Sequence, residues 1–582
     1  MFDEILDQGA AAMQWDLRIT VAVGLLSILV LTRVVTSIRS NLALRRSGDG
    51  KTPPIMPYAL PGIGNMLAFA FDTKSLLSTI IDQFGPNIPV RIRVLNIKLN
   101  FISGSESVLA IFRGSRDLTT APAATLVLEN AFGCPASVRH VFDRDNTGIL
   151  TQPLEGSNPL EPHNRFFSLS HRSLHRHLSG TGLNELASRF MSCLETELAA
   201  LDIGHEEWTT IPDFYDLIKQ TVFKASTTAL CGPNLFALNP DFTDDFWEFD
   251  THITKLFKNL PRWMIPKSFQ VREKLKASMM KWHKHAEEKF DKNDEALQNL
   301  EWEELYGAKL MRARYEDLMG IDGFNEEAYA AADLGMIWGA NANIVPIIGW
   351  SMIDTLVRPK LLSQAREEIS SLTDPSPKGA IGLNMPKLLA SPLLQSIYSE
   401  ELRLRNGVII QRVPIVDNFK IGNWKFPKGD MIITSSWHEQ RDRSVWNEGP
   451  VNGEVHSVED FWAERFLVYP NDPNSGPAKP GRDVKSKVKP AVEDVAGDAG
   501  NQPKFTIDSV TGSYIPYGGG QKICPGRFYA KQEAIGAMAM FLTMFDIELE
   551  KNDLPKPNME YFPFGVVPPL GTFPARMRRR KL

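Results

Sequence analysis

Apolar residues recur every three or four positions along most of the chain beyond residue 65, which is the period of an amphipathic helix. Residues 408–413 and 419–426 suggest a strand pair with Gly422-Asn423 as the turn, and the apolar run 431–433 follows. This pattern predicts a mainly α fold with a small β region and no internal repeat. The clearest predicted helices are residues 183–201, 214–230, 269–290, 327–357 and 528–542.

Residues 19–38 form a mostly apolar run of about the length that crosses a bilayer, and Arg33 is its only charged residue. Arg33 lies near one end, where its long side chain can reach the interface. Acidic residues precede the run and basic residues follow it, which predicts that the body stays on the cytosolic side. We therefore expect a short segment 1–18 and a single membrane anchor over 19–38. A cleaved signal peptide and a buried core helix are the alternatives.

The anchor is followed by a proline-rich strip, residues 53–64, which cannot be helical. We interpret residues 39–64 as a basic flank and a stiff hinge. The remainder, 65–582, is predicted to be one large domain. Within it, residues 468–512 are polar and rich in Pro, Gly, Lys and Asp, so we expect a flexible surface insertion there.

Composition narrows the class of protein. The chain has 582 residues, of which 43% are hydrophobic and 23% charged, so it can bury a sizeable core. Its formal net charge of −5 gives no general footprint for binding nucleic acid. The four cysteines are too few and too scattered for a disulfide framework, and they lack the paired spacing of a zinc site. A reduced body that faces the cytosol is the expectation.

Cys524 lies in the stretch Tyr517-Gly-Gly-Gly-Gln-Lys-Ile-Cys-Pro-Gly-Arg527, directly before a predicted helix. The glycines let the backbone approach a flat ligand closely. The positive end of the helix is expected to favour the thiolate over the thiol. A thiolate held against a plane is what an axial haem ligand requires. The alternative is a structural cysteine in a glycine-rich turn.

The predicted helix around Ala340 and Pro346 carries small residues and then a proline. Pro346 has no N–H, so the carbonyl of Ala342 loses its helical partner and the helix should distort there. A groove at this point can hold oxygen and water beside a flat cofactor. A kinked core helix is the alternative.

The loop around Cys524 resembles the haem loop of the cytochrome P-450 family, Phe-x-x-Gly-x-x-x-Cys-x-Gly, with Tyr517 in place of Phe. Glu400, Arg403 and Arg465 occur in the order in which that family pairs a Glu-x-x-Arg helix with a later arginine. The resemblance implies haem b ligated by Cys524, with the trio in a structural role. It implies further cofactor contacts from Tyr517, Gly518, Gly520, Gly526, Lys522, Arg412 and Ala340.

Two further regions depart from the family pattern. Arg172 and Arg176 resemble a propionate-binding helix, but the usual Trp-x-x-x-Arg is missing, and a plain basic helix is the alternative. Ala342-Asn343 replaces the usual acid and threonine, as in the branch that contains sterol 7α- and 12α-hydroxylases and prostacyclin synthase. Asn343, with the backbone at Ala342, is then expected to organise oxygen and water in place of that pair.

The resemblance implies a single-pass enzyme of the endoplasmic reticulum membrane that oxidises a bulky hydrophobic substrate of sterol, terpenoid or polyketide type, in secondary or lipid metabolism. Electrons are expected from an NADPH-cytochrome reductase that docks beside Lys522, Arg527 and Lys531. Because the branch also contains isomerases, a reductase-independent isomerase or dehydratase stays open. A non-catalytic haem-binding protein is the third possibility.

Overall fold

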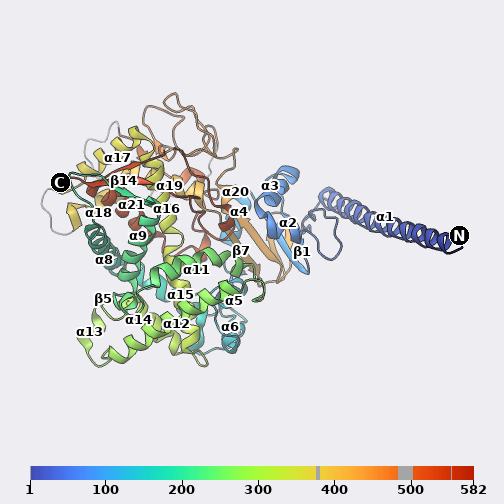
Figure 1. Cartoon of the computed structure of the whole chain (residues 1–582), viewed down its shortest axis with the longest axis horizontal. Coiled ribbons are helices and arrows are strands. Elements are labelled where there is room, and N and C mark those ends of the chain that lie inside the picture. Colours follow the sequence, from blue (N-terminus) through green and yellow to red (C-terminus); the bar gives the residue numbers. More distant parts are fainter. Residues whose placement is uncertain (1, 375–379, 483–501, 552, 582) are drawn as a thin grey trace. The chain divides into compact units, whose positions relative to one another are not determined.

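The computed structural model describes residues 2–374, 380–482, 502–551 and 553–581, and side chains from residue 17 onward (Figure 1). The chain forms two compact units. The first consists of Met1–Thr119 with Ile410–Thr434, and the second of Thr120–Ile409 with Ser435–Leu582.

The first unit contains a mixed five-stranded sheet with the strand order β1-β2-β10-β7-β3. Strand β10 runs parallel to β2, whereas β1–β2 and β3–β7 are antiparallel pairs. Four helices and a separate hairpin, β8–β9, complete the unit. The bounds are α1 (Phe2–Arg45), α2 (Met66–Phe71), α3 (Thr73–Phe84), α4 (Ser105–Arg113), β1 (Val90–Val94), β2 (Ile97–Phe101), β3 (Leu118–Thr119), β7 (Ile409–Pro414), β8 (Phe419–Ile421), β9 (Trp424–Phe426) and β10 (Met431–Ser435).

The predicted turn at Gly422-Asn423 is confirmed, because Ile421 of β8 pairs with Trp424 of β9 and Gly422 has a φ of 54°. The run at 408–413 is a strand as predicted, but it does not pair with this hairpin. It becomes β7, between β10 and β3, and most of its side chains are buried. The alternation of residues predicted the strand, whereas its neighbours depend on distant segments.

Helix α1 is apolar enough to cross a membrane over Leu17–Arg45, and its side chains as far as Leu31 are mostly exposed. The helix continues beyond residue 38. Arg33 does not extend toward an interface as expected, because its guanidinium donates to the carbonyl of Pro57. Thr36 also bonds the backbone of Tyr58, with its hydroxyl 3.0 Å from the carbonyl oxygen. The end of the helix is therefore attached to the proline-rich strip.

That strip is not helical, as predicted, and it is also fixed on its other side. The amide of Arg91 in β1 donates to the carbonyl of Pro54 at 2.7 Å, and the amide of Met56 donates to the carbonyl of Arg91 at 2.8 Å. Prolines suit such an edge because they need no partner for a missing N–H. Within the first unit the strip is thus bonded to both α1 and β1.

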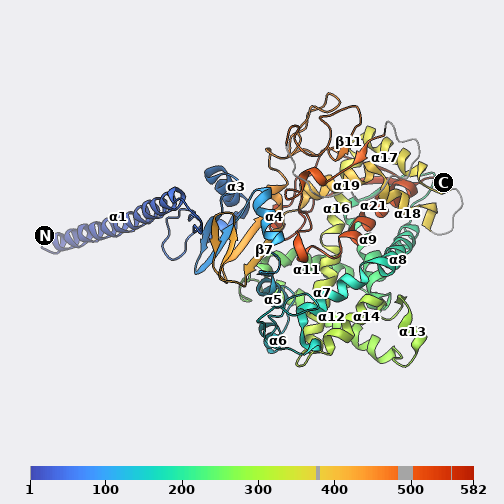
Figure 2. The same cartoon turned by 180° about the vertical axis from the view of Figure 1, so that it is seen from behind.

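The second unit is predominantly helical. Helices α9, α16 and α21 form its interior (Figures 1 and 2). Helices α9 and α21 each pack on α8, and α16 packs on α9 and α21. The bounds are α5 (Ala121–Asn130), α6 (Arg139–Arg144), α7 (Phe166–His177), α8 (Gly180–Ala199), α9 (Phe214–Cys231), α10 (Asn234–Leu238), α11 (Phe242–Phe257), α12 (Pro266–Lys289), α13 (Glu295–Asn299), α14 (Lys309–Met319), α15 (Glu326–Asn341), α16 (Ile344–Leu356), α17 (Pro359–Ser371), α18 (Met385–Ala390), α19 (Pro392–Arg405), α20 (Ser436–Glu439) and α21 (Arg527–Met544).

Short strands complete the second unit. The antiparallel sheet β13-β14-β4 and the pairs β5–β6 and β11–β12 contain all its remaining named strands. Their bounds are β4 (Thr209–Ile211), β5 (Trp302–Glu303), β6 (Gly307–Ala308), β11 (Leu467–Val468), β12 (Lys504–Phe505), β13 (Phe545–Leu549) and β14 (Ala575–Arg579). The predicted mainly α fold with a small β region is confirmed.

The long helix predicted over residues 327–357 is broken where Pro346 predicted a distortion. Helix α15 ends at Asn341 and α16 begins at Ile344. Together they are apolar enough to cross a membrane, but most of this stretch is buried inside the unit, as in a core helix. The break therefore lies inside the second unit.

The predicted insertion at 468–512 is folded at both described ends, while residues 483–501 lie outside the described residues. Strand β11 pairs with β12, and the ring of Phe505 lies 6.1 Å from that of Phe466. Val510 is fully buried in the same cluster as Trp446. The expectation of a flexible loop is wrong for these ends, because their few apolar residues find a common cluster.

Candidate functional site

The glycine-rich loop is closed by backbone hydrogen bonds that place Cys524 just before α21. The amide of Cys524 donates to the carbonyl of Tyr517 at 3.0 Å, and the amide of Ile523 donates to Gly520 at 3.3 Å. Gly518 and Gly520 have φ angles of 70° and 69°, which residues other than glycine rarely adopt. The glycines are therefore needed for the shape of the loop.

The sulfur of Cys524 is accessible, and it belongs to no disulfide. The amides of Gly526 and Arg527 donate hydrogen bonds to it and favour the thiolate. Burial nevertheless outweighs them, and the net pKa of the thiol is raised. The expected contribution of the helix start is therefore present, but it does not determine the net pKa. A bound metal ion deprotonates a coordinating thiol outright, so the raised pKa of the free thiol is compatible with a thiolate ligand.

Two predicted residues of the loop are held by neighbouring helices. The hydroxyl of Tyr517 is in hydrogen-bond contact with that of Tyr398 on α19. The ammonium of Lys522 lies 3.3 Å from the hydroxyl of Thr120, directly before α5. Both contacts lie within the second unit and tie the loop to separate helices.

Helix α7 presents histidines to the loop, not the two arginines considered from the sequence. Nε2 of His171 lies 3.2 Å from the carbonyl oxygen of Gln521, and the ring of His175 lies 4.2 Å from that of His171. Arg172 and Arg176 are exposed, and their charges act on the pKa of Asp317 instead. The signal for the histidines was present, since residues four apart share a helix face.

Glu400, Arg403 and Arg465 meet in a fully buried ion cluster. Arg403 donates to both carboxylate oxygens of Glu400, at 2.7 and 2.8 Å, and Nε of Arg465 donates to Oε1 at 3.0 Å. Arg403 and Arg465 lower the pKa of Glu400 to about 2, although burial alone raises it. Both guanidinium groups also bond to backbone carbonyls, with Arg403 contacting Val458 at 2.7 Å and Arg465 contacting Ser457 at 2.9 Å. The cluster therefore fixes the loop before Arg465.

The break between α15 and α16 is open on one face. Gly339 is exposed, and Met336, Ala340 and Asn343 are half-buried, whereas most other residues of the two helices are buried. These four recur at helical spacing, so they line one accessible strip. The side chain of Asn343 is not free to act on this strip alone, because its Oδ1 accepts a hydrogen bond from the amide of Val566 at 2.9 Å.

An aromatic cluster lies beside this break and was not foreseen from the sequence. The rings of Phe257 and Phe564 are stacked 4.9 Å apart, and Trp338 lies 5.5 Å from Phe257. Asp250 accepts from the indole of Trp338 and from the hydroxyl of Tyr561, both at 2.8 Å. Burial raises the pKa of Asp250 to about 6. These residues come from three distant segments, so no local pattern indicated them.

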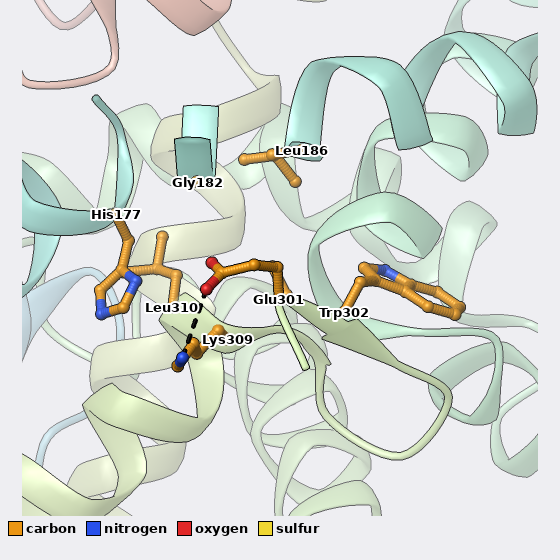
Figure 3. A pocket seen from close by; sticks show the side chains of 8 residues that line it. His177, Gly182, Leu186, Glu301, Trp302, Lys309 and Leu310 are labelled. Carbon is orange, nitrogen blue, oxygen red and sulfur yellow. Dashed lines mark hydrogen bonds and ion pairs between the residues drawn. The ribbon is translucent and has the colours of Figure 1, made fainter. Parts of the chain in front are cut away.

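Arg412 belongs to the first unit, on β7. Its guanidinium is buried, which lowers its pKa to about 10, and its Nη1 donates to the carbonyl of Gln411. A separate hollow in the second unit contains none of the predicted site residues. An ion pair between Lys309 and Glu301, 3.3 Å long, lies within it (Figure 3). It is lined by His177, Gly182, Leu186, Glu301, Trp302, Ala308, Lys309 and Leu310.

The residues present fit a haem. An accessible sulfur with two amides directed at it, a loop shaped by glycines and the cation of Lys522 match the needs of an axially ligated, doubly anionic plane. The residues of the loop therefore support haem as the cofactor, as the sequence predicted.

Comparisons with known proteins give the same answer. A sequence model described as "Cytochrome P450" matches residues 211–467. The cytochrome P450 monooxygenase efuG of Hormonema carpetanum is 34% identical, over 95% of both chains. The cytochrome P450 monooxygenase fsoE of Humicola fuscoatra is 35% identical, over 94% of this chain and 91% of its own.

More distant matches agree. Cholesterol 7-alpha-monooxygenase of Cricetulus griseus is 23% identical over 70% of this chain and 74% of its own, in the branch indicated by Asn343. The structure of retinoic acid-bound cyanobacterial CYP120A1 has a TM-score of 0.59 at 17% identity, and covers 92% of this chain and 100% of its own. The chain is therefore a member of the cytochrome P450 family of haem-thiolate proteins, to which these named monooxygenases belong.

Proposed function

We propose that this chain binds haem b through Cys524 and monooxygenates a bulky hydrophobic molecule of sterol, terpenoid or polyketide type, in secondary or lipid metabolism. The observation that carries the proposal is the accessible sulfur of Cys524, with the amides of Gly526 and Arg527 directed at it. When bound, a thiolate-ligated haem supplies reductive activation of dioxygen. The chain's own residues bind this group, orient it and control the surroundings of the substrate.

The loop residues would hold the cofactor in distinct ways. The two amides spread the negative charge of the sulfur, and amide donors to thiolates tune the ligand. Lys522 is the cation proposed for the carboxylates of haem, and His171 is added because it contacts the loop at Gln521. Arg412, which lies in the first unit, stays a prediction from the family resemblance. The buried ion cluster of Glu400 keeps the preceding loop in place and touches no substrate.

Asn343 has a narrower role than an acid and a threonine. A neutral amide donates and accepts hydrogen bonds but does not release a proton near neutral pH. Protons must therefore reach the site through water or the substrate. Asn343 and the backbone at Ala342 orient the oxygen and water that lie against Ala340. This proposal agrees with the accessible strip on α15.

The proposed substrate class is supported by the half-buried rings of Phe257, Trp338 and Phe564, since apolar and aromatic linings bind bulky hydrophobic ligands. The proposed electron donor is an NADPH-cytochrome reductase on the cysteine side. Arg527 is the cation proposed for that contact, and its Nη1 also donates to the carbonyl of Cys524 at 3.0 Å. Lys531 bonds to Gln395 at 2.5 Å, and burial lowers its pKa. We place the enzyme in the endoplasmic reticulum membrane through the single apolar helix α1.

A reductase-independent isomerase or dehydratase is the second candidate, and a non-catalytic haem protein the third. Neither is favoured, because efuG and fsoE, the relatives above 30% identity described here, are both named monooxygenases. The asparagine at 343 occurs in both hydroxylases and isomerases of the branch. A turnover assay with and without an electron donor is therefore needed to separate the two activities.

The assignment of Cys524 is tested with full-length protein in detergent. Cys524→Ala is expected to abolish the thiolate signature in the reduced carbon monoxide spectrum, because no other sulfur replaces the ligand. Cys193→Ala is the control and should keep it, since that cysteine is half-buried on α8. A normal thiolate spectrum in Cys524→Ala refutes the ligand.

The reaction is tested separately, with extracts of cells that lack the protein as the substrate source. Addition of reductase and NADPH should produce a new product that carries one atom from labelled dioxygen. Turnover of an oxygenated lipid peroxide without any electron donor would refute the monooxygenase in favour of the isomerase.

A further inference from the structure

We propose that Asn343 is a positioning residue: its side-chain carbonyl holds residues 562–567, here termed the C-terminal segment, so that Phe564 stays in the aromatic cluster. The proposal rests on the proposed function and deepens it. It names the residue that determines whether a bulky ligand is held beside the break between α15 and α16. The hydrogen bond between Oδ1 of Asn343 and the amide of Val566, 2.9 Å long, is its starting point.

This hydrogen bond fixes the orientation of the asparagine amide. A backbone N–H can only donate, so the oxygen of the side chain must face Val566 and the NH2 group must point elsewhere. Asn343 is half-buried, so its side chain is not fully enclosed by the unit. The residue thus has one structural function, through its oxygen, and a donor in a fixed direction.

Gly565 is shaped to fit Asn343. A Cβ atom added at residue 565 would lie 2.7 Å from Oδ1 of Asn343, closer than any ordinary contact. The neighbouring atoms leave little room to move. The amide of Gly407 donates to the carbonyl of Gly565 at 3.0 Å, and the amide of Val567 donates to Arg405 at 2.8 Å. A side chain at 565 would therefore displace Oδ1 of Asn343 from its position against the amide of Val566.

The break in the helix places Asn343 where it can make this contact. Because Pro346 has no N–H, α15 stops at Asn341, and Asn343 precedes α16 with φ −100° and ψ −39°. The rest of α16 supports the same segment, since the indole of Trp350 donates to the carbonyl of Val567 at 2.9 Å. Two points on one helix thus hold two successive residues of the segment.

The ring of Phe564 directly precedes these fixed residues. It is stacked on Phe257, at the end of α11, with an interplanar angle of 11°, and Phe257 contacts Trp338 of α15. Loss of the Asn343 carbonyl leaves the amide of Val566 without an acceptor, which loosens the backbone next to Phe564 although Gly565 and Val567 keep their own bonds. A large ligand that depends on this ring then loses affinity, whereas a small one does not.

The test uses the full-length holoenzyme and two azole probes, imidazole as the small ligand and clotrimazole as the bulky one. Asn343→Ala should weaken clotrimazole binding about tenfold in spectral titrations, the equivalent of about 1.4 kcal/mol. Imidazole binding should be unchanged. Hydrogen exchange at Val566 should become faster. Equal losses for both azoles, or unchanged exchange at Val566, overturn the proposal.

Two further variants exclude a merely structural defect. Asn343→Asp keeps an oxygen acceptor, so it should restore slow exchange at Val566. Gly565→Ala should weaken clotrimazole binding when Asn343 is present. It should change that binding little when combined with Asn343→Ala, because the clashing oxygen is then gone. If the effects of the two substitutions on clotrimazole binding are additive, the proposed contact between Asn343 and Gly565 is contradicted. Gly204→Ala is the matched control, since a Cβ there meets nothing within 4 Å.

The two proposals fail in different ways. If the native protein lacks the thiolate spectrum, the function proposed above is wrong, whatever happens at Val566. If the spectrum is normal and Asn343→Ala leaves hydrogen exchange at Val566 unchanged, only the positioning role is wrong.

Discussion

Glu533 and Glu400 are both buried glutamates, yet their surroundings move their pKa values in opposite directions. Glu400 faces two arginines, which lower its pKa to about 2. Glu533, on α21, accepts a hydrogen bond from the hydroxyl of Ser226 at 2.7 Å, and burial raises its pKa to about 8. Glu533 is therefore mostly protonated near neutral pH, although the same residue ionises near 4.5 in an unfolded chain.

The raised pKa of Glu533 predicts a pH-dependent cost in stability. Between about pH 4.5 and 8 the folded chain retains a proton that the unfolded chain has lost, so stability falls as pH rises through this window. Glu533→Gln keeps an oxygen for Ser226 and removes the titration. We expect it to stabilise the protein by on the order of 3 kcal/mol near pH 8 and by little near pH 5.

Thermal unfolding at the two pH values measures this effect. Glu185→Gln, an exposed glutamate on α8, is the control and should change stability at neither pH. A loss of stability in Glu533→Gln near pH 8 would show that the carboxylate is charged and needed there.

The two glutamates also show what single residues reveal in a sequence. Glu400 was predictable, because Arg403 lies one helical turn away and Arg465 follows in a recognisable order. Glu533 was not, since its partner Ser226 is 307 positions distant. The same holds for His171, whose contact is with Gln521 in a loop far along the chain.

At the scale of elements, one carboxylate joins three segments. Asp250 on α11 accepts from Trp338 on α15 and from Tyr561 at the end of the short 3-10 helix Met559–Tyr561. Both partners are donors, so both oxygens of the carboxylate are needed as acceptors. This arrangement fixes α11 and the C-terminal residues relative to the broken helix.

Asp250→Asn is expected to loosen these three elements together. An asparagine must turn its NH2 group toward one of the two donors, which costs about 1–3 kcal/mol for the unsatisfied group. Hydrogen exchange should become faster in α11 and around Tyr561, and remain unchanged in α19. Asp244→Asn, on the exposed face of α11, is the control. Unchanged exchange around Tyr561 would contradict the joint role of Asp250.

The elements themselves were largely predictable, because helical periodicity and a proline act locally. The break after Asn341 follows from the missing N–H of Pro346. The place of β7 in its sheet was not predictable, since β10 and β3 come from remote segments. Nor was the folding of both described ends of residues 468–512, which depends on the cluster around Trp446.

At the scale of the whole molecule, α1 combines two tasks. Its exposed apolar part suits a membrane, while Arg33 and Thr36 bond the proline-rich strip, and Thr36 and Ser40 are buried. The end of the helix therefore belongs to the folded first unit. Its apolar beginning does not contribute to that unit.

Two truncations separate these tasks. Deletion of residues 2–30 should release the protein from membranes and leave its stability unchanged, because Arg33, Thr36 and Ser40 remain. Deletion of residues 2–45 should also release it, but should cost about 1–3 kcal/mol and accelerate hydrogen exchange at Tyr58, whose amide donates to the hydroxyl of Thr36 at 3.2 Å. Membrane sedimentation and exchange measure the two effects. Equal exchange in both truncations would show that the strip needs no helix.

The sequence by itself determined the type of fold, the apolar helix, the break at Pro346 and the cysteine loop, because each depends on residues close together in the chain. Only the tertiary structure showed that burial outweighs the amides at Cys524, that His171 rather than Arg172 or Arg176 contacts the loop, and that the oxygen of Asn343 accepts from Val566. Those outcomes depend on desolvation and on partners hundreds of residues away. The spacing of a motif specifies the chemical group, whereas the packing around it determines what that group can do.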